Sequence, residues 1–358
     1  MTHTKTSPPP PGSAARRFRR TGTGPPPVAP AGDARRRGRR ETLAGYLFLS
    51  PWVLGMLLLT LGPMLASLYL SFTEYDLFNA PRWTGFDNYR AMFEDPRWAT
   101  SVGVTLQYVL IATPLKLAAA LGVALLLARP RRGLGFYRSA FYAPSLIGAS
   151  VSIGIVWRAI FQDEAVVDRS LRLFGADIGG WVGDPDWAIH TLVALAVWQF
   201  GAPMVIFLAG LKQVPRELYE AAEVDGAGAW RRFRSVTLPL ISPVLFFNLL
   251  LETIHSFQVF TSAYVVSNGR GGPADSTLFY TLYLYEKGFR EFRMGYASAM
   301  AWMLMLGVGL VTFVLFRTQR GWVHYEGEGR GPMSRTEPGS RRARRVRVRV
   351  RRVRRVRR

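Results

Sequence analysis

Residues 220–226 read Glu-Ala-Ala-Glu-Val-Asp-Gly, and residues 236–239 read Val-Thr-Leu-Pro. The first stretch is polar and contains small residues, and it lies between two long apolar segments, 188–211 and 240–266. Each segment is long enough to cross a bilayer, which takes roughly 20 apolar residues. We therefore interpret 212–239 as a loop at a membrane surface, between two membrane-spanning helices.

The residues of this loop predict a short helix, a turn and a second short helix. Pro215 suits the first turn of a helix, because its missing N–H is not needed there. Glu217 lies in the same turn, where the helix dipole favours an acid. Asp225-Gly226 suits the end, because glycine tolerates the left-handed conformation of a helix terminus. The second helix is expected at about 228–235, before Leu238-Pro239 opens the next span.

Six apolar runs of roughly 20 residues or more predict an all-α membrane protein with six transmembrane helices. The runs lack the strict 3.6-residue periodicity of helices that cover a soluble core. Serine and glycine dilute the third run. Their i, i+4 spacing in Ser145/Ala149, Gly148/Ser152 and Ser150/Gly154 would let a helix pack closely against a neighbour in lipid. The six runs are 43–72, 102–128, 136–157, 188–211, 240–266 and 295–316.

The charges between these runs predict their orientation. Lysines and arginines gather in the N-terminal arm, in 129–138, in 212–234 and directly after the sixth run, all on one side. The loops on the other side, 74–95 and 163–186, carry eleven of the 24 acidic residues. Because basic loops stay in the cytoplasm, both termini are expected to be cytoplasmic.

The net charge of +22 resides in the two ends of the chain. Ten basic residues lie in 1–40 and twelve arginines in 341–358, and the remaining 24 basic residues match the 24 acidic ones. We expect 1–40 and 326–358 to be disordered tails around a membrane domain at 41–325. The C-terminal tail is either an extension without a selected role or a polybasic segment on anionic lipids. It contains no aromatic residue for base stacking in 341–358, so no nucleic-acid partner is expected.

Polar residues inside the apolar runs predict a solute pathway. Asn248, Glu252 and His255 stand at i, i+4 and i+7 and project from one helical face, with Gln258 on its edge. Lys116 lies in the middle of the second run, where it either pairs with Glu252 or lines a cavity. Ionisable groups at bilayer depth usually face a bundle interior and mark function. The alternative is that these groups satisfy one another or pack against a partner.

The spacing Glu-Ala-Ala-x3-Gly-x9-Val-x-Leu-Pro over 220–239 resembles the cytoplasmic coupling loop of bacterial ABC importer permeases. The resemblance covers about 43–320. Within this family, the chain is most similar to the first permease subunit of lactose, maltose and glycerol-phosphate systems. It implies the type I ABC importer permease fold, with six spans and a cytoplasmic coupling helix. Further stretches that carry it are Leu49-Ser50-Pro51, Gly85-Phe86-Asp87-Asn88-Tyr89, Phe136-Tyr137-Arg138, Ser256-Phe257-Gln258-Val259-Phe260, Gly271-Gly272-Pro273 and Gly295-Tyr296-Ala297-Ser298-Ala299.

The resemblance implies a carbohydrate permease subunit in a bacterial inner membrane, forming half of a sugar pathway. Its partners would be a second homologous permease, a pair of cytoplasmic ATP-binding subunits and an extracytoplasmic solute-binding protein. ATP and magnesium would bind to the ATPase partner, and this chain would hold no cofactor. The residues expected to couple to the ATPase are Glu220, Ala221, Ala222, Asp225, Gly226, Leu238 and Pro239.

The chain itself is not expected to be an enzyme. None of its four lysines follows a glycine, so the Walker A motif that holds nucleotide phosphates is missing. It has no cysteine, and its four histidines stand far apart, so no metal site is predicted. The main alternative is an ion-coupled secondary transporter that uses Glu252, His255 or Lys116 for protons. A membrane-embedded lipid transferase is a weaker one, because no interfacial loop holds paired carboxylates or a His/Asp cluster.

Overall fold

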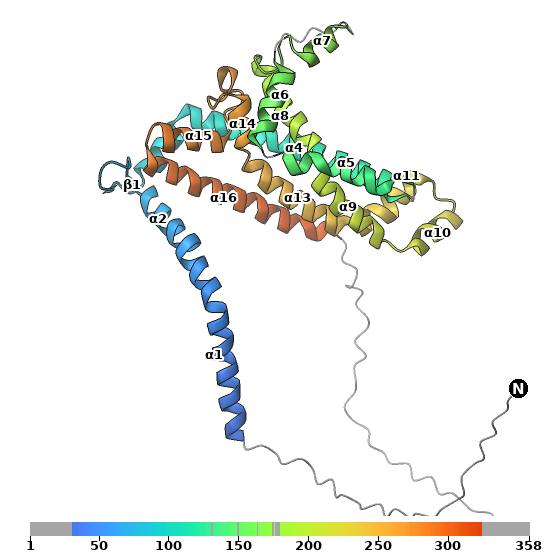
Figure 1. Cartoon of the computed structure of the whole chain (residues 1–358), viewed down its shortest axis with the longest axis horizontal. Coiled ribbons are helices and arrows are strands. Elements are labelled where there is room, and N and C mark those ends of the chain that lie inside the picture. Colours follow the sequence, from blue (N-terminus) through green and yellow to red (C-terminus); the bar gives the residue numbers. More distant parts are fainter. Residues whose placement is uncertain are drawn as a thin grey trace, which may run out of the picture. The chain divides into compact units, whose positions relative to one another are not determined.

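The computed structural model describes residues 31–129, 132–148, 150–162, 164–173, 175 and 180–323, and nearly all of its elements are helices (Figure 1). The chain divides into two units, with the boundary between Ser67 and Leu68. The predicted all-α class is confirmed. The predicted tails lie largely outside the described residues, although the first helix already begins at Ala31, inside the expected N-terminal tail.

The first unit consists of α1 (Ala31–Gly55), a π-helical segment at Met56–Leu61 and the start of α2 (Gly62–Ser71). The stretch Leu43–Ser71 is long and apolar enough to cross a membrane, as the first run predicts. Its apolar side chains are largely exposed within the unit, which suits a helix surrounded by lipid or by other helices.

Two spans of the second unit are straight. They are α4 (Pro96–Ala128) and Met294–Gly321, which joins α16 (Met294–Thr318) to a terminal 3₁₀ turn. The side chain of Asp95 accepts a hydrogen bond from the Arg97 amide at 3.0 Å, and Pro96 follows the cap, so the sequence fixes where α4 begins. The predicted runs 102–128 and 295–316 lie within these helices.

Three other candidate spans are bent. The angle is 99° between Leu134–Ile147 and Val151–Leu173, 43° between Pro185–Trp198 and Gly201–Gln213, and 69° between Ala229–Leu240 and Ser242–Phe257. Among the described residues there are thus three straight spans, or six if each bent pair crosses the membrane once. The bounds are α5 (Leu134–Ile147), α6 (Val151–Phe161), α7 (Val166–Leu173), α8 (Pro185–Trp198), α9 (Gly201–Gln213), α11 (Ala229–Arg232), α12 (Leu238–Leu240) and α13 (Ser242–Phe257).

The run 136–157, predicted as the third span, is broken in the structure. α5 ends at Ile147, and the Ser150 side chain caps α6 by accepting a hydrogen bond from the Ile153 amide at 3.3 Å. Gly148/Ser152 and Ser150/Gly154 therefore do not share one helical face. The close approach occurs elsewhere, because a Cβ at Gly154 would lie 2.9 Å from the Val265 side chain.

The core of the second unit is built around α4. The N-terminal half of this helix, including Tyr108, packs against Leu192 of α8 and Phe279. Its other half packs against α9 and the start of the α13 segment, where Phe207 and Ile241 are fully buried. A third cluster, with Met92 and Tyr283 at its centre, joins the short elements to α16. Burial of these side chains fixes α4, α8, α9 and α13 as one bundle.

Short elements gather at one end of this bundle. β1 (Thr73–Glu74) and β2 (Arg82–Trp83) form an antiparallel pair, with Thr73 opposite Trp83. Gly295 of α16 lies against the end of β1, because its amide donates at 3.1 Å to the carbonyl of Tyr75, the residue after the strand. The other elements here are α3 (Asp87–Glu94), α14 (Thr261–Val266), a 3₁₀ turn at Pro273–Asp275, α15 (Tyr280–Tyr285) and a π-helical segment at Glu286–Arg290.

Candidate functional site: a polar cavity and a coupling helix

A cavity of about 480 Å³ lies between α4, α8, α9 and α13. Its walls mix apolar residues with side chains that donate and accept hydrogen bonds. Two of the helix breaks lie beside it. Gly148, at the break after α5, and Gln199, at the break after α8, both line the cavity. The polar lining residues are Tyr108, Lys116, Ser145, Gln199, Glu252, His255, Ser256, Gln258, Thr261 and Ser262.

Lys116 of α4 and Glu252 of α13 form an ion pair on the wall of this cavity. The lysine Nζ lies 2.7 Å from Oε2 of the glutamate, and both side chains are mostly buried. Of the two roles predicted for Lys116, pairing with Glu252 and lining a cavity, the structure contains both. The pair removes the cost that either charge would carry alone at bilayer depth.

Two hydrogen bonds hold the cavity walls. The hydroxyls of Thr113 in α4 and Ser256 in α13 lie 3.0 Å apart, one turn from the ion pair. The Gln199 side chain donates from Nε2 to the Gly148 carbonyl at 3.0 Å, so the two helix breaks contact each other. These contacts fix the cavity shape with side chains that carry no net charge.

Of the four residues predicted to share a polar face on the fifth run, three line the cavity and one does not. Glu252 and His255 lie on α13 and line the cavity, and His255 remains exposed. Gln258 also lines it, but from the residue after the helix, whose φ of −104° and ψ of 13° are not helical. Asn248 is buried away from the cavity lining, and its Nδ2 has no hydrogen-bond partner among the described residues.

The stretch Glu220–Gly226 contains the end of a helix, and the helix ends as the sequence predicts. α10 (Arg216–Val224) starts directly after Pro215, and Gly226 has a φ of +73°. The Gly226 amide donates to the Glu223 carbonyl at 3.0 Å, and the Ala227 amide donates to the Ala222 carbonyl at 2.9 Å. These two bonds are those of the Schellman motif, which satisfies the last carbonyls of a helix and needs a left-handed residue.

α10 is held against the bundle on one side and is open on the other. The Tyr219 hydroxyl lies 3.0 Å from that of Thr237, and Glu223 pairs with Arg232 at 3.1 Å. Glu220 and Ala221 are exposed, and Val224 is 88% exposed although it is apolar. The second short helix is shorter than predicted: α11 stops at Arg232, and a π-helical segment, Phe233–Thr237, continues to α12, which contains Leu238 and Pro239.

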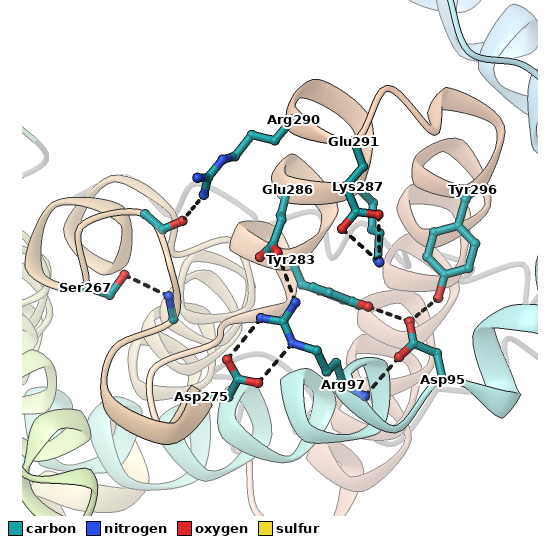
Figure 2. A network of polar contacts seen from close by, with 12 residues as sticks. Asp95, Arg97, Ser267, Asp275, Tyr283, Glu286, Lys287, Arg290, Glu291 and Tyr296 are labelled. Carbon is teal, nitrogen blue, oxygen red and sulfur yellow. Dashed lines mark hydrogen bonds and ion pairs between the residues drawn. The ribbon is translucent and has the colours of Figure 1, made fainter.

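At the opposite end of the second unit, a charged network joins the start of α4 to α16 and to the segments before it (Figures 1 and 2). Arg97 donates two hydrogen bonds to the Asp275 carboxylate and one to Glu286, each at 3.0 Å. Asp95 accepts hydrogen bonds from the hydroxyls of Tyr283 at 2.5 Å and Tyr296 at 3.0 Å. Figure 2 shows these side chains converging from separate elements.

Burial raises the pKa of the Asp95 carboxyl, but the hydrogen bonds from Tyr283, Tyr296 and the Arg97 amide, together with the charge of Lys287, outweigh it. The pKa therefore lies below its ordinary value, and the carboxylate is the stable form. This network was not predicted from the sequence. Its one local signal is Asp95-Pro96-Arg97 at the start of a span, and its partners lie 178 or more positions away.

Comparison with known proteins identifies the family of this chain. The family described as binding-protein-dependent transport system inner membrane component matches residues 118–321. The chain is 50% identical to the probable ABC transporter permease protein YesP of Bacillus subtilis (strain 168), over 80% of this chain and 94% of that protein. It is 31% identical to the lactose transport system permease protein LacF of Rhizobium radiobacter, over 77% and 94% of the two chains.

The fold has a solved counterpart. A bacterial alginate ABC transporter, crystallised in complex with an alginate pentasaccharide-bound periplasmic protein, contains a chain that superposes with a TM-score of 0.67 at 19% identity. The superposition covers 79% of this chain and 96% of that one. The bundle with its bent spans is thus the fold of an ABC importer permease, a multi-pass inner-membrane protein. The chain belongs to the binding-protein-dependent transport system inner membrane component family.

Proposed function

We propose that this chain is the membrane subunit of an ATP-driven importer for a sugar or a sugar-like solute. The observation that carries the proposal is its membership of a permease family whose relatives include one named for lactose transport. The polar cavity suits such a solute, because sugar hydroxyls need both donors and acceptors, and Gln199, His255 and Gln258 supply both. The chain would form half of the pathway, and a second homologous permease would form the other half.

α10 would be the helix on which the ATPase subunits act. Its small residues Ala221 and Ala222 let a partner approach closely, and Val224 offers an exposed apolar contact. The Tyr219–Thr237 contact ties the helix to the last residue of the π-helical segment. α12 follows that segment directly and leads into α13, which carries Glu252 and His255. A displacement of α10 would therefore reach the cavity through packed helices. Glu220, Asp225 and Gly226 would complete the docking surface for the ATPase, with Leu238 and Pro239 at the entry to the span.

In this mechanism ATP binding closes the pair of ATPase subunits, and α10 moves with them. The spans then rock and open the cavity to the outside, where an extracytoplasmic binding protein delivers the solute. Hydrolysis resets the inward-facing state. ATP and magnesium belong to the partner subunits, and this chain would contribute no catalytic residue. Both termini and α10 would face the cytoplasm, because the loops on that side carry the basic residues.

The test is a mild-detergent pull-down of the tagged chain, with identification of the co-purified proteins by mass. Gly226→Val forces a β-branched residue into a left-handed conformation, at a cost of roughly 1–2 kcal/mol. Gly228→Val is the matched control, because Gly228 is extended, with φ of −63°, and a Cβ there would meet nothing within 4 Å. We expect wild type and the control to retain an ATPase subunit and a second permease, and Gly226→Val to lose the ATPase.

A wild-type chain that is stable and purifies alone would contradict the proposal. It would favour an ion-coupled transporter, for which the buried Lys116–Glu252 pair is the specific supporting observation. Uptake measurements separate the two mechanisms. An importer continues to accumulate solute when an uncoupler collapses the proton gradient while ATP is maintained, and an ion-coupled transporter stops.

A further inference from the structure

A second cavity, of about 1240 Å³, is separate from the polar cavity and lies beside α10. It is formed by the last turn of α4, the first turns of α5, the end of α9 and the segment from α10 to Thr237. These helix ends are span ends, so the cavity lies at the edge of the membrane. Its volume exceeds the roughly 300–1,000 Å³ typical of small-molecule sites.

All the charged side chains that line this cavity are positive. Its lining contains five cationic residues and no carboxylate: Arg129, Arg138, Lys212, Arg216 and Arg232. Only Arg232 forms an ion pair within the described part of the chain, with Glu223. The Nε of Arg138 is buried and has no hydrogen-bond partner there. Unpaired cations that share a cavity repel one another, so the arrangement favours an anionic ligand.

The remaining walls are apolar. Leu125, Leu134 and Phe233 line the cavity, and so does the aromatic side chain of Trp230, which is 71% exposed. Aromatic residues concentrate where membrane meets water. A free phosphate ion needs no apolar wall of this kind, whereas a lipid presents a phosphate and acyl chains together.

We propose that this cavity binds the phosphate headgroup of an anionic phospholipid from the cytoplasmic leaflet, with the acyl chains along α4 and α5. Arg138 and Lys212 hold the phosphate from two different helices, and the apolar wall takes the start of the chains. Basic pockets between helices on the cytoplasmic side are suited to anionic headgroups. The inference rests on the proposed orientation of the chain. It places a lipid between α4, α5 and the base of the coupling helix.

The acidic groups of α10 argue against an acidic protein segment as the occupant. Glu217 and Glu220 are exposed on α10 and are absent from the cavity lining, so the surface proposed for the ATPase and the basic cavity differ in charge. An acidic segment of the ATPase would have to reach past these carboxylates. A membrane lipid reaches the cavity from the side of the spans.

The experiment uses the full-length chain in nanodiscs of phosphatidylcholine with added phosphatidylglycerol, and native mass spectrometry counts the retained lipid. Arg138→Gln/Lys212→Gln removes two cavity charges. The matched control, Arg317→Gln/Arg320→Gln, removes two exposed cations at the end of α16, outside the cavity. We expect the cavity variant to bind phosphatidylglycerol roughly tenfold or more weakly and the control to bind as wild type does. The Arg-rich segment 341–358 is present in all three proteins, so its contribution is constant.

A second measurement needs no removal of charge. Bromine atoms on lipid chains quench nearby tryptophans, and the difference between wild type and Trp230→Phe isolates the signal of Trp230. We expect brominated phosphatidylglycerol to quench Trp230 more strongly than brominated phosphatidylcholine does.

In the retention experiment, equal lipid retention in all three proteins or equal loss in both variants would overturn the proposal. So would inorganic phosphate bound in phosphatidylcholine nanodiscs with the same dependence on the variants. In the quenching experiment, equal quenching of Trp230 by the two lipids would overturn it. Loss of an ATPase subunit from the cavity variant with lipid retention unchanged would also overturn it and assign the cavity to a protein. Lipid retention is measured without transport, so failure here is distinct from failure of the importer proposal.

Discussion

Lys116 and Glu252 stand 136 positions apart in the sequence and form an ion pair, Nζ to Oε2 at 2.7 Å, on the wall of the polar cavity. The pair joins α4, the central helix of the bundle, to α13, the helix that follows the coupling segment. Neither charge has a second ionic partner among the described residues. We infer that each residue makes the other tolerable at membrane depth.

The pair predicts unequal effects of single and double substitutions. Lys116→Met leaves the Glu252 carboxylate without its partner in a mostly buried position, and removing one member of a buried pair costs about 3–5 kcal/mol. We expect a marked fall in the melting temperature of the purified chain and poor insertion in membranes. Thermal unfolding followed by size-exclusion chromatography measures this loss.

The double variant Lys116→Met/Glu252→Gln is the control. It removes both charges, so it should recover most of the stability that Lys116→Met loses. If the single and double variants were equally unstable, the ion pair would not be the reason for the loss, and the cavity would depend on the lysine side chain for packing alone.

The sequence was sufficient for the class of the fold and for the coupling stretch, because both depend on local signals. Run length and the absence of polar periodicity predict membrane helices at 102–128 and 295–316, and glycine at 226 predicts a left-handed turn. The break at 148–150 was not predicted. A run of apolar residues does not reveal that Ser150 will cap a new helix, since that depends on how α5 and α6 pack on α9 and α14.

The candidate site was predicted in part for the same reason. Helical spacing places Glu252 and His255 on one face, and both line the cavity. The same spacing includes Asn248, which the structure buries elsewhere, because the cavity occupies only one end of α13. The partners of Arg97 could not be predicted from the sequence, because contacts between residues that are far apart in the sequence leave no local pattern.

The charged network predicts a dependence of stability on pH. The Asp95 pKa is lowered in the folded chain, so its carboxylate contributes stability above the ordinary pKa of about 3.9, and this contribution is lost as pH falls through the lowered value. We expect the melting temperature of wild type to fall between about pH 5 and pH 3. Asp95→Asn should start lower at neutral pH and fall less over this range.

Glu94→Gln is the matched control for this measurement. Glu94 precedes Asp95, is exposed and has no hydrogen-bond or ionic partner among the described residues, so its removal should leave the pH dependence of wild type unchanged. An Asp95→Asn chain with the same acid sensitivity as wild type would show that other carboxylates cause the loss.

The proposed orientation predicts which side of the membrane each loop faces. The chain has no cysteine, so a single introduced cysteine reports its own accessibility. Gln213→Cys lies exposed at the end of α9 and should react with an impermeant maleimide only after the cells are opened. Asn79→Cys, exposed in the loop between β1 and β2, should react in intact cells. The reverse pattern would invert the orientation and remove α10 from the side where ATP is available.

The last prediction separates the residues that line the cavity from the one that does not. If the cavity binds solute, His255→Ala and Gln258→Ala each remove a hydrogen-bonding group from its wall, at a cost of about 1 kcal/mol, or roughly a fivefold rise in KM for uptake. Asn248→Ala removes a buried amide outside the lining and should change the melting temperature without raising KM. Uptake of labelled solute over a range of concentrations gives KM and the maximal rate for all three. An unchanged KM for both His255→Ala and Gln258→Ala would show that this wall does not contact the solute, because two of its polar groups could then be removed without weakening binding.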